Sequence, residues 1–277
     1  MGTERRPRAL RLPALLLLLL LSLSVACTQV NPATGKEELV IISAEAEMRI
    51  GLSVDRQIRT EFKVRDDGPA AARVKSVGAR IAAVSDRQDV EYRFALVAAN
   101  DMNAFAAPGG FVYATSGLVA KADDDELACV IGHECGHIAA RHGVKTLQAG
   151  MAASLFTALL DKNTKKKEYK AAAQAAVTLL LLGYSRRHEY EADLLGVRYA
   201  WRAGYDPHGM VSFFRKLKKV EQKRGSFPEF LSTHPDLDKR IRAVEKVIRT
   251  ELSNPDGTLK KPPAPPEDGG TRVSEPS

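Results

Sequence analysis

The chain has 277 residues, enough for one or two domains, and 44% of them are hydrophobic, as in a globular protein with a sizeable core. The formal net charge is +7, but the first 26 residues hold four arginines and one glutamate, so the remainder carries only +4. This mild charge, without a basic helix that carries interleaved aromatic residues, argues against nucleic-acid binding, and we expect no nucleic-acid partner.

The first 26 residues have the pattern of an export signal. A basic stretch at 5–11 precedes an apolar run at 15–21, and mostly small residues follow at 22–26. The apolar part is too short to cross about 30 Å of hydrocarbon comfortably. We therefore expect a cleaved signal peptide over residues 1–26 rather than a transmembrane anchor.

The first residue after this signal is Cys27. Residues 23–27 read Leu-Ser-Val-Ala-Cys, which resembles a bacterial lipobox, although Ser24 stands where the usual match has leucine. We expect lipidation of Cys27, with plain signal cleavage as the alternative, and two or more acyl chains would hold the protein on a membrane surface. Because Thr28 follows where aspartate would resemble an inner-membrane retention signal, the predicted location is the bacterial periplasm, at the outer membrane.

Composition divides the rest of the chain into three parts. Residues 27–42 contain turn-forming pairs and are predicted to be the lipidated N-terminus and a linker. Residues 43–252 have the periodic patterns of a folded domain. Residues 253–277 are rich in proline and glycine, which predicts a disordered tail.

The first half of the domain is predicted to mix helices with strands. One helix should begin after Ser43 and a second at Pro69, which is an allowed first position. Apolar residues alternate with others over 90–96, which is typical of a half-buried strand. Residues 103–107 and 111–115 flank Pro-Gly-Gly and should form a hairpin.

The second half is predicted to be helical, so the fold class is α+β, mainly helical with a small antiparallel sheet. The apolar segments 149–160 and 171–183 are too short to span a membrane, and core helices, a hydrophobic lid or a membrane-dipping element would each explain them. Cys129 and Cys135 lie too far apart on one helix for a disulfide. The helices are expected at 123–142, 144–160, 171–183, 185–203, 207–220 and 235–252.

The most informative motif is His133-Glu134-Cys135-Gly136-His137. On a helix, residues four apart differ by about 40° around the axis, so His133 and His137 can bind one cation. Glu134 can reach a metal-bound water without binding the metal itself. The helix is apolar all round and should be buried. This pattern predicts a metallopeptidase, in which the ion activates water and the carboxylate carries the proton to the leaving amine.

A catalytic zinc usually has three protein ligands and one open position, so a third ligand is expected from elsewhere. Glu189 is the best candidate, because Asp193 shares its helix face and can accept the N–H of a ligating histidine. Glu191 and His188 are rival ligands, although Glu191 should face solvent. His142 lies about 140° around the helix from His137 and is not expected to be a ligand.

These motifs together resemble the gluzincin metalloprotease family of the CAAX prenyl protease and HtpX. The resemblance covers about residues 31–247. Cys135 departs from it, since a larger aliphatic residue is usual there. The chain also lacks the long membrane-spanning helices of those two proteases, and is more like the exported lipoprotein branch associated with outer-membrane quality control. The supporting matches are His133 to His137, Ser185-Arg186 with Glu189 and Asp193, Asn103 to Gly110, Gly117-Leu118, Thr233-His234-Pro235 with Arg240, and Asn31 to Lys36.

The resemblance implies a zincin-like metalloprotease domain over 43–252 that binds one zinc ion per chain. It implies that Glu189 is the third zinc ligand. It also implies that His234 is a catalytic residue near the metal, where it stabilises the oxyanion or covers the open site. On its pattern alone, His234 would be an ordinary loop histidine before a proline.

The residues Asn103, Ala104, Phe105 and Ala106 are predicted to bind substrate. An edge strand of small residues is an aggregation hazard unless it has a use, and the use we expect is pairing with an extended peptide. A buried core strand is the alternative.

The sequence therefore predicts a zinc-dependent endopeptidase that acts on misfolded or misassembled cell-envelope proteins. The rival hypothesis is a periplasmic chaperone or assembly factor with little proteolysis on the same fold. Glu134 favours chemistry, because a protein that only binds its clients would not need it.

Overall fold

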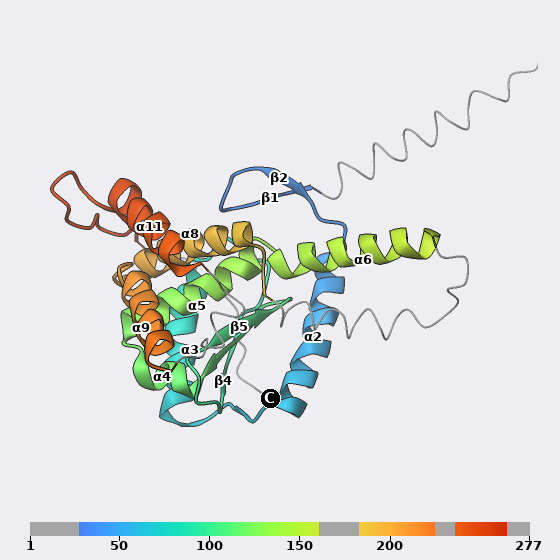
Figure 1. Ribbon diagram of the computed structural model, residues 1–277, viewed down its shortest axis with the longest axis horizontal. Helices are drawn as coiled ribbons and strands as arrows, with labels where there is room; N and C mark the ends of the chain where they lie inside the picture. The colour runs from blue at the N-terminus through green and yellow to red at the C-terminus, as the bar shows by residue number, and fades with distance from the viewer. Residues whose placement is uncertain (1–27, 161–182, 225–235, 265–277) are drawn as a thin grey trace, which may run out of the picture.

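A computed structural model describes residues 28–160, 183–224 and 236–264, and the side chains of 152–160 and 221–224 are outside that description (Figure 1). The elements in chain order are β1 (Thr28–Val30), β2 (Glu37–Leu39), α2 (Ala44–Glu61), β3 (Val64–Arg65), α3 (Gly68–Ala83), β4 (Arg93–Val97), β5 (Ala104–Ala107), β6 (Phe111–Thr115), α4 (Ser116–Lys121), α5 (Asp124–Ala139), α6 (His142–Leu160), α8 (Arg186–Arg202), α9 (Gly209–Arg224), α11 (Leu237–Val247) and the π-helix η1 (Ile248–Leu252). The predicted mainly helical α+β class is confirmed, and the predicted helix at 171–183 falls on residues outside the description apart from Gly183.

The central sheet has the strand order β3-β4-β6-β5 among the described residues. The outer pairs β3–β4 and β5–β6 are antiparallel, and β5 and β6 form the predicted hairpin. The middle pair β4–β6 is parallel, with Arg93 opposite Phe111 and Val97 opposite Thr115, a pairing that local patterns do not predict. In this order β5 occupies one edge of the sheet.

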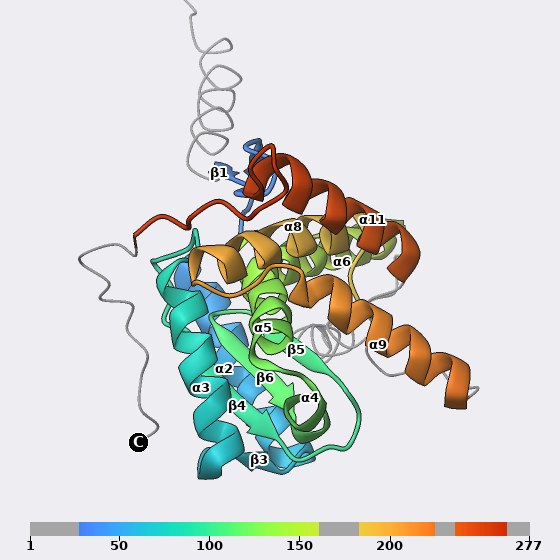
Figure 2. The same cartoon turned by 90° about the vertical axis from the view of Figure 1, so that its left-hand side faces the viewer.

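Helices cover both faces of this sheet (Figure 2). Phe94 and Leu96 pack into the main core with α3 and α5, whereas Ala95 and Val97 pack with Val54 of α2 on the other face. The prediction of a half-buried strand was therefore wrong for β4, because α2 buries the face that the alternation assigned to solvent.

The helix boundaries follow from local capping. Ser43 accepts a hydrogen bond from the backbone N–H of Ala46 and begins α2, as predicted. Asp123 and Glu126 form a capping box at the start of α5. The helix expected to run to residue 142 instead ends at Ala139, and Arg141 has a left-handed φ of 53° before α6 begins. This break gives α6 a new direction.

The α5 and α8 helices pack closely because glycines line their contact. A Cβ atom at Gly132 would lie 2.8 Å from the carbonyl oxygen of Gly196, and one at Gly196 would lie 2.7 Å from the backbone nitrogen of His133. Real Cβ atoms essentially never approach so closely, so a side chain at either position would separate the helices. This close contact brings the histidine motif of α5 against the acidic motif of α8.

The segments that flank the domain are also folded against it. Within the expected linker 27–42, β1 and β2 form a hairpin, and the Asn31 side chain is buried. Within the expected tail 253–277, Ser253 pairs with Leu259, and the Trp201 indole N–H donates to the Lys260 carbonyl over 2.8 Å. Contacts with the domain are therefore also made by residues 28–42 and by residues 253–260.

The structure also bears on the two cysteines and on the length and polarity of the helices. Cys129 and Cys135 are buried free thiols, as predicted. Within the described residues, the helices are all too short or too polar to cross a membrane.

Candidate metal centre

Three buried side chains converge where α5 meets α8. The Nε2 atoms of His133 and His137 lie 3.0 Å apart. The Glu189 carboxylate lies 3.7 Å from the first of these nitrogens and 3.5 Å from the second. One donor atom from each residue lies within 4.8 Å of the others. Two imidazole nitrogens and one carboxylate oxygen are the donor types of a catalytic zinc site, so the arrangement fits Zn²⁺.

Glu134 lies beside this group on α5 and is fully buried. It does not belong to the cluster of three donors within 4.8 Å. Its charge nevertheless acts on the centre. Burial raises the pKa of the Tyr184 hydroxyl well above its ordinary value, and the charges of Glu134 and Glu189 raise it further. Glu134 is therefore a buried carboxylate on the same helix as the two histidines, outside the cluster of three donors.

His133 is held from behind by a carboxylate of α8. Its Nδ1–H donates to Asp193 over 2.9 Å, the role that the sequence spacing predicted for Asp193. The buried Arg240 guanidinium of α11 bonds the two Asp193 oxygens at 2.6 and 2.7 Å. It also lies 2.9 Å from Glu189. Burial alone raises the pKa of Asp193, but Arg240 and His133 lower it below its ordinary value.

His137 is held by a different set of residues. Its Nδ1 lies 2.9 Å from Nδ1 of His142, and Nε2 of His142 lies 3.1 Å from Glu191. Glu191 also accepts hydrogen bonds from Asn31 and Arg187. Burial lowers the pKa of His137 well below its ordinary value and also lowers that of His142, so both rings are neutral near pH 7.

The sequence prediction for Glu191 was wrong, because its side chain is buried rather than solvent-facing. The 140° separation assigned to His142 assumed one continuous helix, and the break at Arg141 removes that assumption. His142 is outside the three-residue donor cluster, as expected, but it contacts a proposed ligand directly. The local signal that could have revealed Glu191 is its pairing with Arg187 four residues earlier.

Aromatic rings enclose the same side of the centre. Tyr184 stacks on His137 with ring centroids 3.9 Å apart, and His188 stacks on His142 at 4.2 Å. Burial, followed by the proximity of His142, lowers the pKa of His188 to about 4. His188 is therefore a neighbour of the His137 support and not one of the three convergent donors. Arg186, which follows Ser185 in the matched motif, is exposed.

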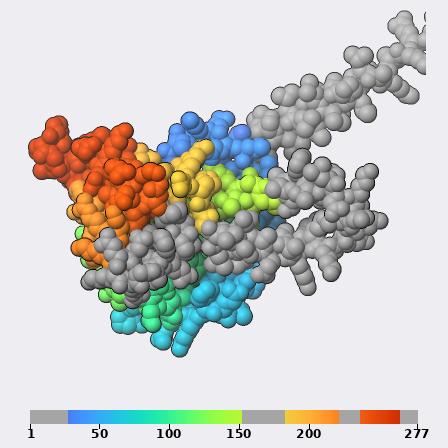
Figure 3. Space-filling view, in the orientation of Figure 1, coloured from blue at the N-terminus to red at the C-terminus, as the bar shows by residue number. Residues whose placement is uncertain are grey.

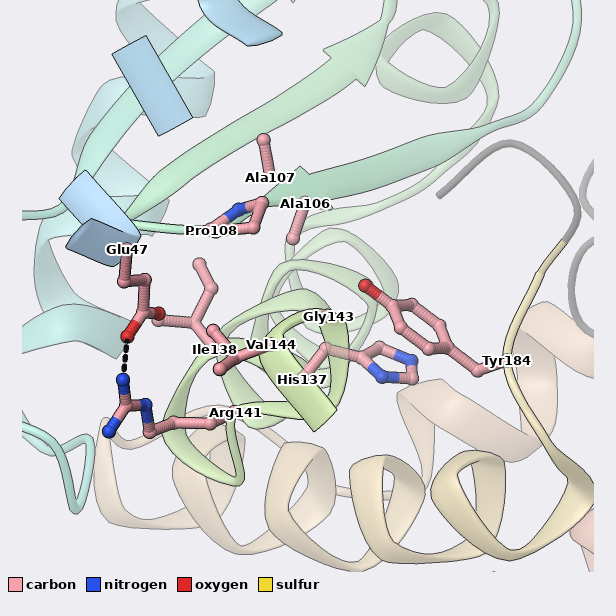
Figure 4. Close-up of a pocket in the computed structure, with 10 residues that line it drawn as sticks. All are labelled: Glu47, Ala106, Ala107, Pro108, His137, Ile138, Arg141, Gly143, Val144 and Tyr184. Atoms are coloured by element: carbon pink, nitrogen blue, oxygen red, sulfur yellow. Dashed lines mark ion pairs between the residues drawn. The ribbon is translucent and has the colours of Figure 1, made fainter. Parts of the chain in front are cut away.

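A small pocket lies between His137 and the edge strand β5. Figure 4 shows Ala106 and Pro108 on one wall, with His137 and the Tyr184 ring on the other. Its lining includes Ala106 of the predicted substrate strand but not Asn103, Ala104 or Phe105. The full lining is Glu47, Ala106, Ala107, Pro108, His137, Ile138, Arg141, Gly143, Val144 and Tyr184.

A buried ion-pair cluster supports one end of this pocket. Glu47 of α2 pairs with Arg87 and Arg141, each at 2.8 Å. The Gly109 N–H at the β5–β6 turn approaches Glu47 at 3.4 Å. The cluster thus ties α2 and the hairpin turn to the end of the motif helix, which fixes β5 relative to His137.

Two predicted site residues, Cys27 and His234, lie outside the described residues.

Comparison with known proteins places the chain in a peptidase family. Residues 69–248 match the profile of "Peptidase family M48". The chain is 29% identical over 223 residues to mitochondrial metalloendopeptidase OMA1 of Schizosaccharomyces pombe, an alignment that covers 78% of this chain and 65% of the relative. It is 28% identical over 220 residues to the beta-barrel assembly-enhancing protease of Escherichia coli K12, which covers 76% of this chain and 45% of that protein. The chain thus spans about half to two thirds of these relatives' lengths.

Proposed function

The chain belongs to peptidase family M48, and we propose that it is a zinc-dependent metalloendopeptidase. The observation that carries the proposal is the convergence of His133, His137 and Glu189 within 4.8 Å of one another in the buried contact of α5 and α8. The names of the relatives, a metalloendopeptidase and a protease, support the same activity.

We assign the reaction steps to the residues as follows. His133, His137 and Glu189 would hold the zinc ion, which supplies Lewis acidity toward the scissile carbonyl and toward water. Glu134 takes the proton of the attacking water at its carboxylate and delivers it to the leaving amine. Asp193 keeps the proton of His133 on Nδ1, so that the Nε2 lone pair would be available to bind the metal.

His234 is proposed to stabilise the oxyanion or to cover the open position. Support comes from the family resemblance and from Arg240, which α11 brings to 2.9 Å from Glu189. If His234 stabilises the oxyanion, its replacement by alanine should lower kcat without releasing zinc.

The proposed substrate site is β5, which forms one edge of the sheet among the described residues. Thr115 donates its backbone N–H to the Asn103 carbonyl, and bonded pairs alternate along an antiparallel ladder. Ala104 and Ala106 therefore turn their backbone groups away from β6. Asn103 caps the N–H of Ala104 with its own side chain at 2.9 Å. The N–H of Ala106, which also lines the pocket beside His137, is left as the group best placed to pair with a peptide.

Proline at position 106 tests this substrate site. Ala106→Pro removes the outward N–H, and Ala106→Gly keeps it and serves as the matched control. We expect the proline variant to raise KM by about two- to tenfold, the effect of one hydrogen bond, with zinc content unchanged. Equal KM values in the two folded variants would contradict binding at this edge.

The natural substrates are proposed to be misfolded or misassembled cell-envelope proteins. Backbone pairing along β5 would select extended chains with little preference for side chains, which suits the removal of unfolded clients. The beta-barrel assembly-enhancing proteases among the relatives support an envelope context.

Anchoring through Cys27 is the proposed location signal, and it places the protein at the periplasmic face of the outer membrane. The support is the apolar run and small residues that precede this cysteine. Mass spectrometry of the N-terminal peptide from the native host should find an acylated Cys27 as the first residue. A mature chain that begins at any other residue would contradict the lipoprotein assignment.

Cleavage of casein by the purified protein tests the central proposal. Wild-type protein should contain about one zinc per chain, the occupancy of a single three-ligand site. Glu134→Gln should keep that zinc and lose about 10²- to 10⁴-fold in rate, because it removes the general base. Cleavage at the wild-type rate would refute the role of Glu134. If the wild type and Glu134→Gln both prevented the aggregation of an unfolded client and neither cleaved it, the chaperone hypothesis would be favoured.

A further inference from the structure

A chain of buried polar contacts connects the N-terminal hairpin to His137. The Asn31 amide, at the end of β1, donates to Glu191 Oε2 over 2.8 Å. The same oxygen lies 3.1 Å from Nε2 of His142, whose Nδ1 lies 2.9 Å from Nδ1 of His137. The hairpin lies on the surface beside α8 and α6 (Figure 3).

The chemistry of the groups fixes the direction of each hydrogen bond. Glu191 acts as an acceptor at both oxygens, because the Arg187 guanidinium donates to Oε1 over 2.7 Å and the Asn31 amide donates to Oε2 over 2.8 Å. A carboxylate only accepts, so His142 donates from Nε2. An imidazole that donates from Nε2 accepts at Nδ1, so His137 donates to it from Nδ1 over 2.9 Å. The Nε2 atom of His137 keeps its lone pair and faces Glu189.

Burial makes this arrangement costly to replace. The side chains of Asn31, His142 and Glu191 are all buried. Both Glu191 oxygens have partners, since Arg187 donates to Oε1 over 2.7 Å while Asn31 and His142 share Oε2. A buried carboxylate without these donors would carry a large desolvation cost. The amide of Asn31 therefore helps to hold Glu191 where it orients His142.

We propose that Asn31, Glu191 and His142 are positioning residues that hold His137 in the tautomer with its proton on Nδ1. This makes the hairpin of residues 28–39 a component of the metal centre. The inference rests on the proposed zinc site and adds a residue outside the region 69–248 that matches the family profile.

Two substitutions of His142 separate orientation of His137 from simple packing. In His142→Asn, the amide oxygen replaces Nδ1 and still accepts from His137, but contact with Glu191 is lost. In His142→Gln, the amide nitrogen replaces Nε2 and still donates to Glu191, but His137 loses its acceptor. We expect His142→Gln to raise the zinc Kd by about 10- to 100-fold, measured by competition with a chelator, and His142→Asn to raise it far less.

The visible absorption of the Co²⁺-substituted protein gives a second readout. It should change in His142→Gln and stay near the wild-type spectrum in His142→Asn. A packing role alone predicts the opposite order, because glutamine fills more of the space and satisfies the buried Glu191. Equal zinc affinity in His142→Gln and the wild type would overturn the proposal.

Asn31 provides a test at the far end of the chain of contacts, which remains decisive if the His142 variants fail to fold. Asn31→Ala should raise the zinc Kd by about threefold or more, since it loosens an outer partner of the centre. Gln148→Ala is the matched control, because Gln148 holds the backbone of Ile41 and Ile42 from the same N-terminal segment without touching this network. Equal zinc affinities in these two variants would overturn the role of the hairpin.

The outcomes also separate this inference from the proposed function. Wild-type protein that binds zinc and cleaves casein, together with unchanged zinc affinity in the His142 and Asn31 variants, overturns only the positioning residues. Wild-type protein that binds no zinc overturns both.

Discussion

The two histidines of the motif lie four residues apart on one helix, yet the protein supports them differently. His133 donates to Asp193, which the buried Arg240 clamps through both oxygens. Nδ1 of His137 instead contacts a second imidazole, His142, which in turn contacts the Glu191 carboxylate. The first support is internal to the α5–α8–α11 core, whereas the second ends at a surface hairpin.

The arginines that clamp the two carboxylates show the difference most clearly. The Arg240 side chain is 1% exposed, and the Arg187 side chain, which pairs with Glu191, is 65% exposed. The two ion pairs are therefore expected to contribute unequally to the free energy of unfolding. Two candidate ligands on one helix can thus be supported by contacts of very different stability. The exposed support, Glu191 with Arg187, should be easier to mutate without unfolding the domain than the buried support, Asp193 with Arg240.

The largest expected effect is that of Arg240→Met in the metal-free protein. It leaves the Glu189 and Asp193 carboxylates buried without their counter-charge, so we expect the free energy of unfolding to fall by about 3–5 kcal/mol. Excess zinc should restore part of the loss, because the cation replaces the missing charge. Urea denaturation with and without zinc measures both effects.

The control for this experiment is Arg215→Met, which breaks an exposed pair with Glu245. It should change the free energy of unfolding by less than about 1 kcal/mol. A similarly small loss in Arg240→Met would show that the His133 support is no stronger than a surface ion pair.

An intermediate effect is expected for Gly196→Ala, which disturbs both supports at once. Alanine gains up to about 1 kcal/mol of helix propensity over glycine. Its Cβ atom would however meet the His133 backbone at 2.7 Å, and overpacking of this kind costs about 1–3 kcal/mol. We expect the clash to prevail and zinc affinity to fall, since Glu189 and His133 lie on the two helices that separate.

Thermal unfolding and chelator competition on Gly196→Ala measure these two effects. Arg198→Ala, on a more exposed face of α8, is the control that should retain zinc affinity. A Gly196→Ala protein that is more stable than the wild type would mean that the helices do not approach as closely as described.

The smallest effect is expected for Arg187→Met, the same chemical change as Arg240→Met on the other support. Because Arg187 is largely exposed, its loss should lower the free energy of unfolding by less than about 1 kcal/mol. Glu191 keeps Asn31 and His142 as donors. A loss in urea denaturation as large as that of Arg240→Met would remove the contrast between the two supports.

Much of the candidate site was predictable because its signals are local. The spacing of His133 and His137, and of Glu189 and Asp193, fixes which side chains share a helix face. Ser43 and Asp123 mark helix starts through bonds to their own next turn. These relations depend on a few consecutive residues, so the sequence contains them in full.

The remaining features depend on contacts between distant segments. The second face of β4 is buried because α2 covers it. Glu191 is buried because a hairpin about 160 residues earlier places Asn31 against it. His142 faces His137 because the helix breaks at Arg141.

The sequence by itself therefore determined which side chains can form the proposed centre, that is, the candidate ligands, the candidate proton carrier and the helices that present them. Only the tertiary structure decided how the two ligand histidines are held. The physical reason is that a helix periodicity specifies directions around one axis, whereas the partner of a buried polar group is specified by which other segment packs there.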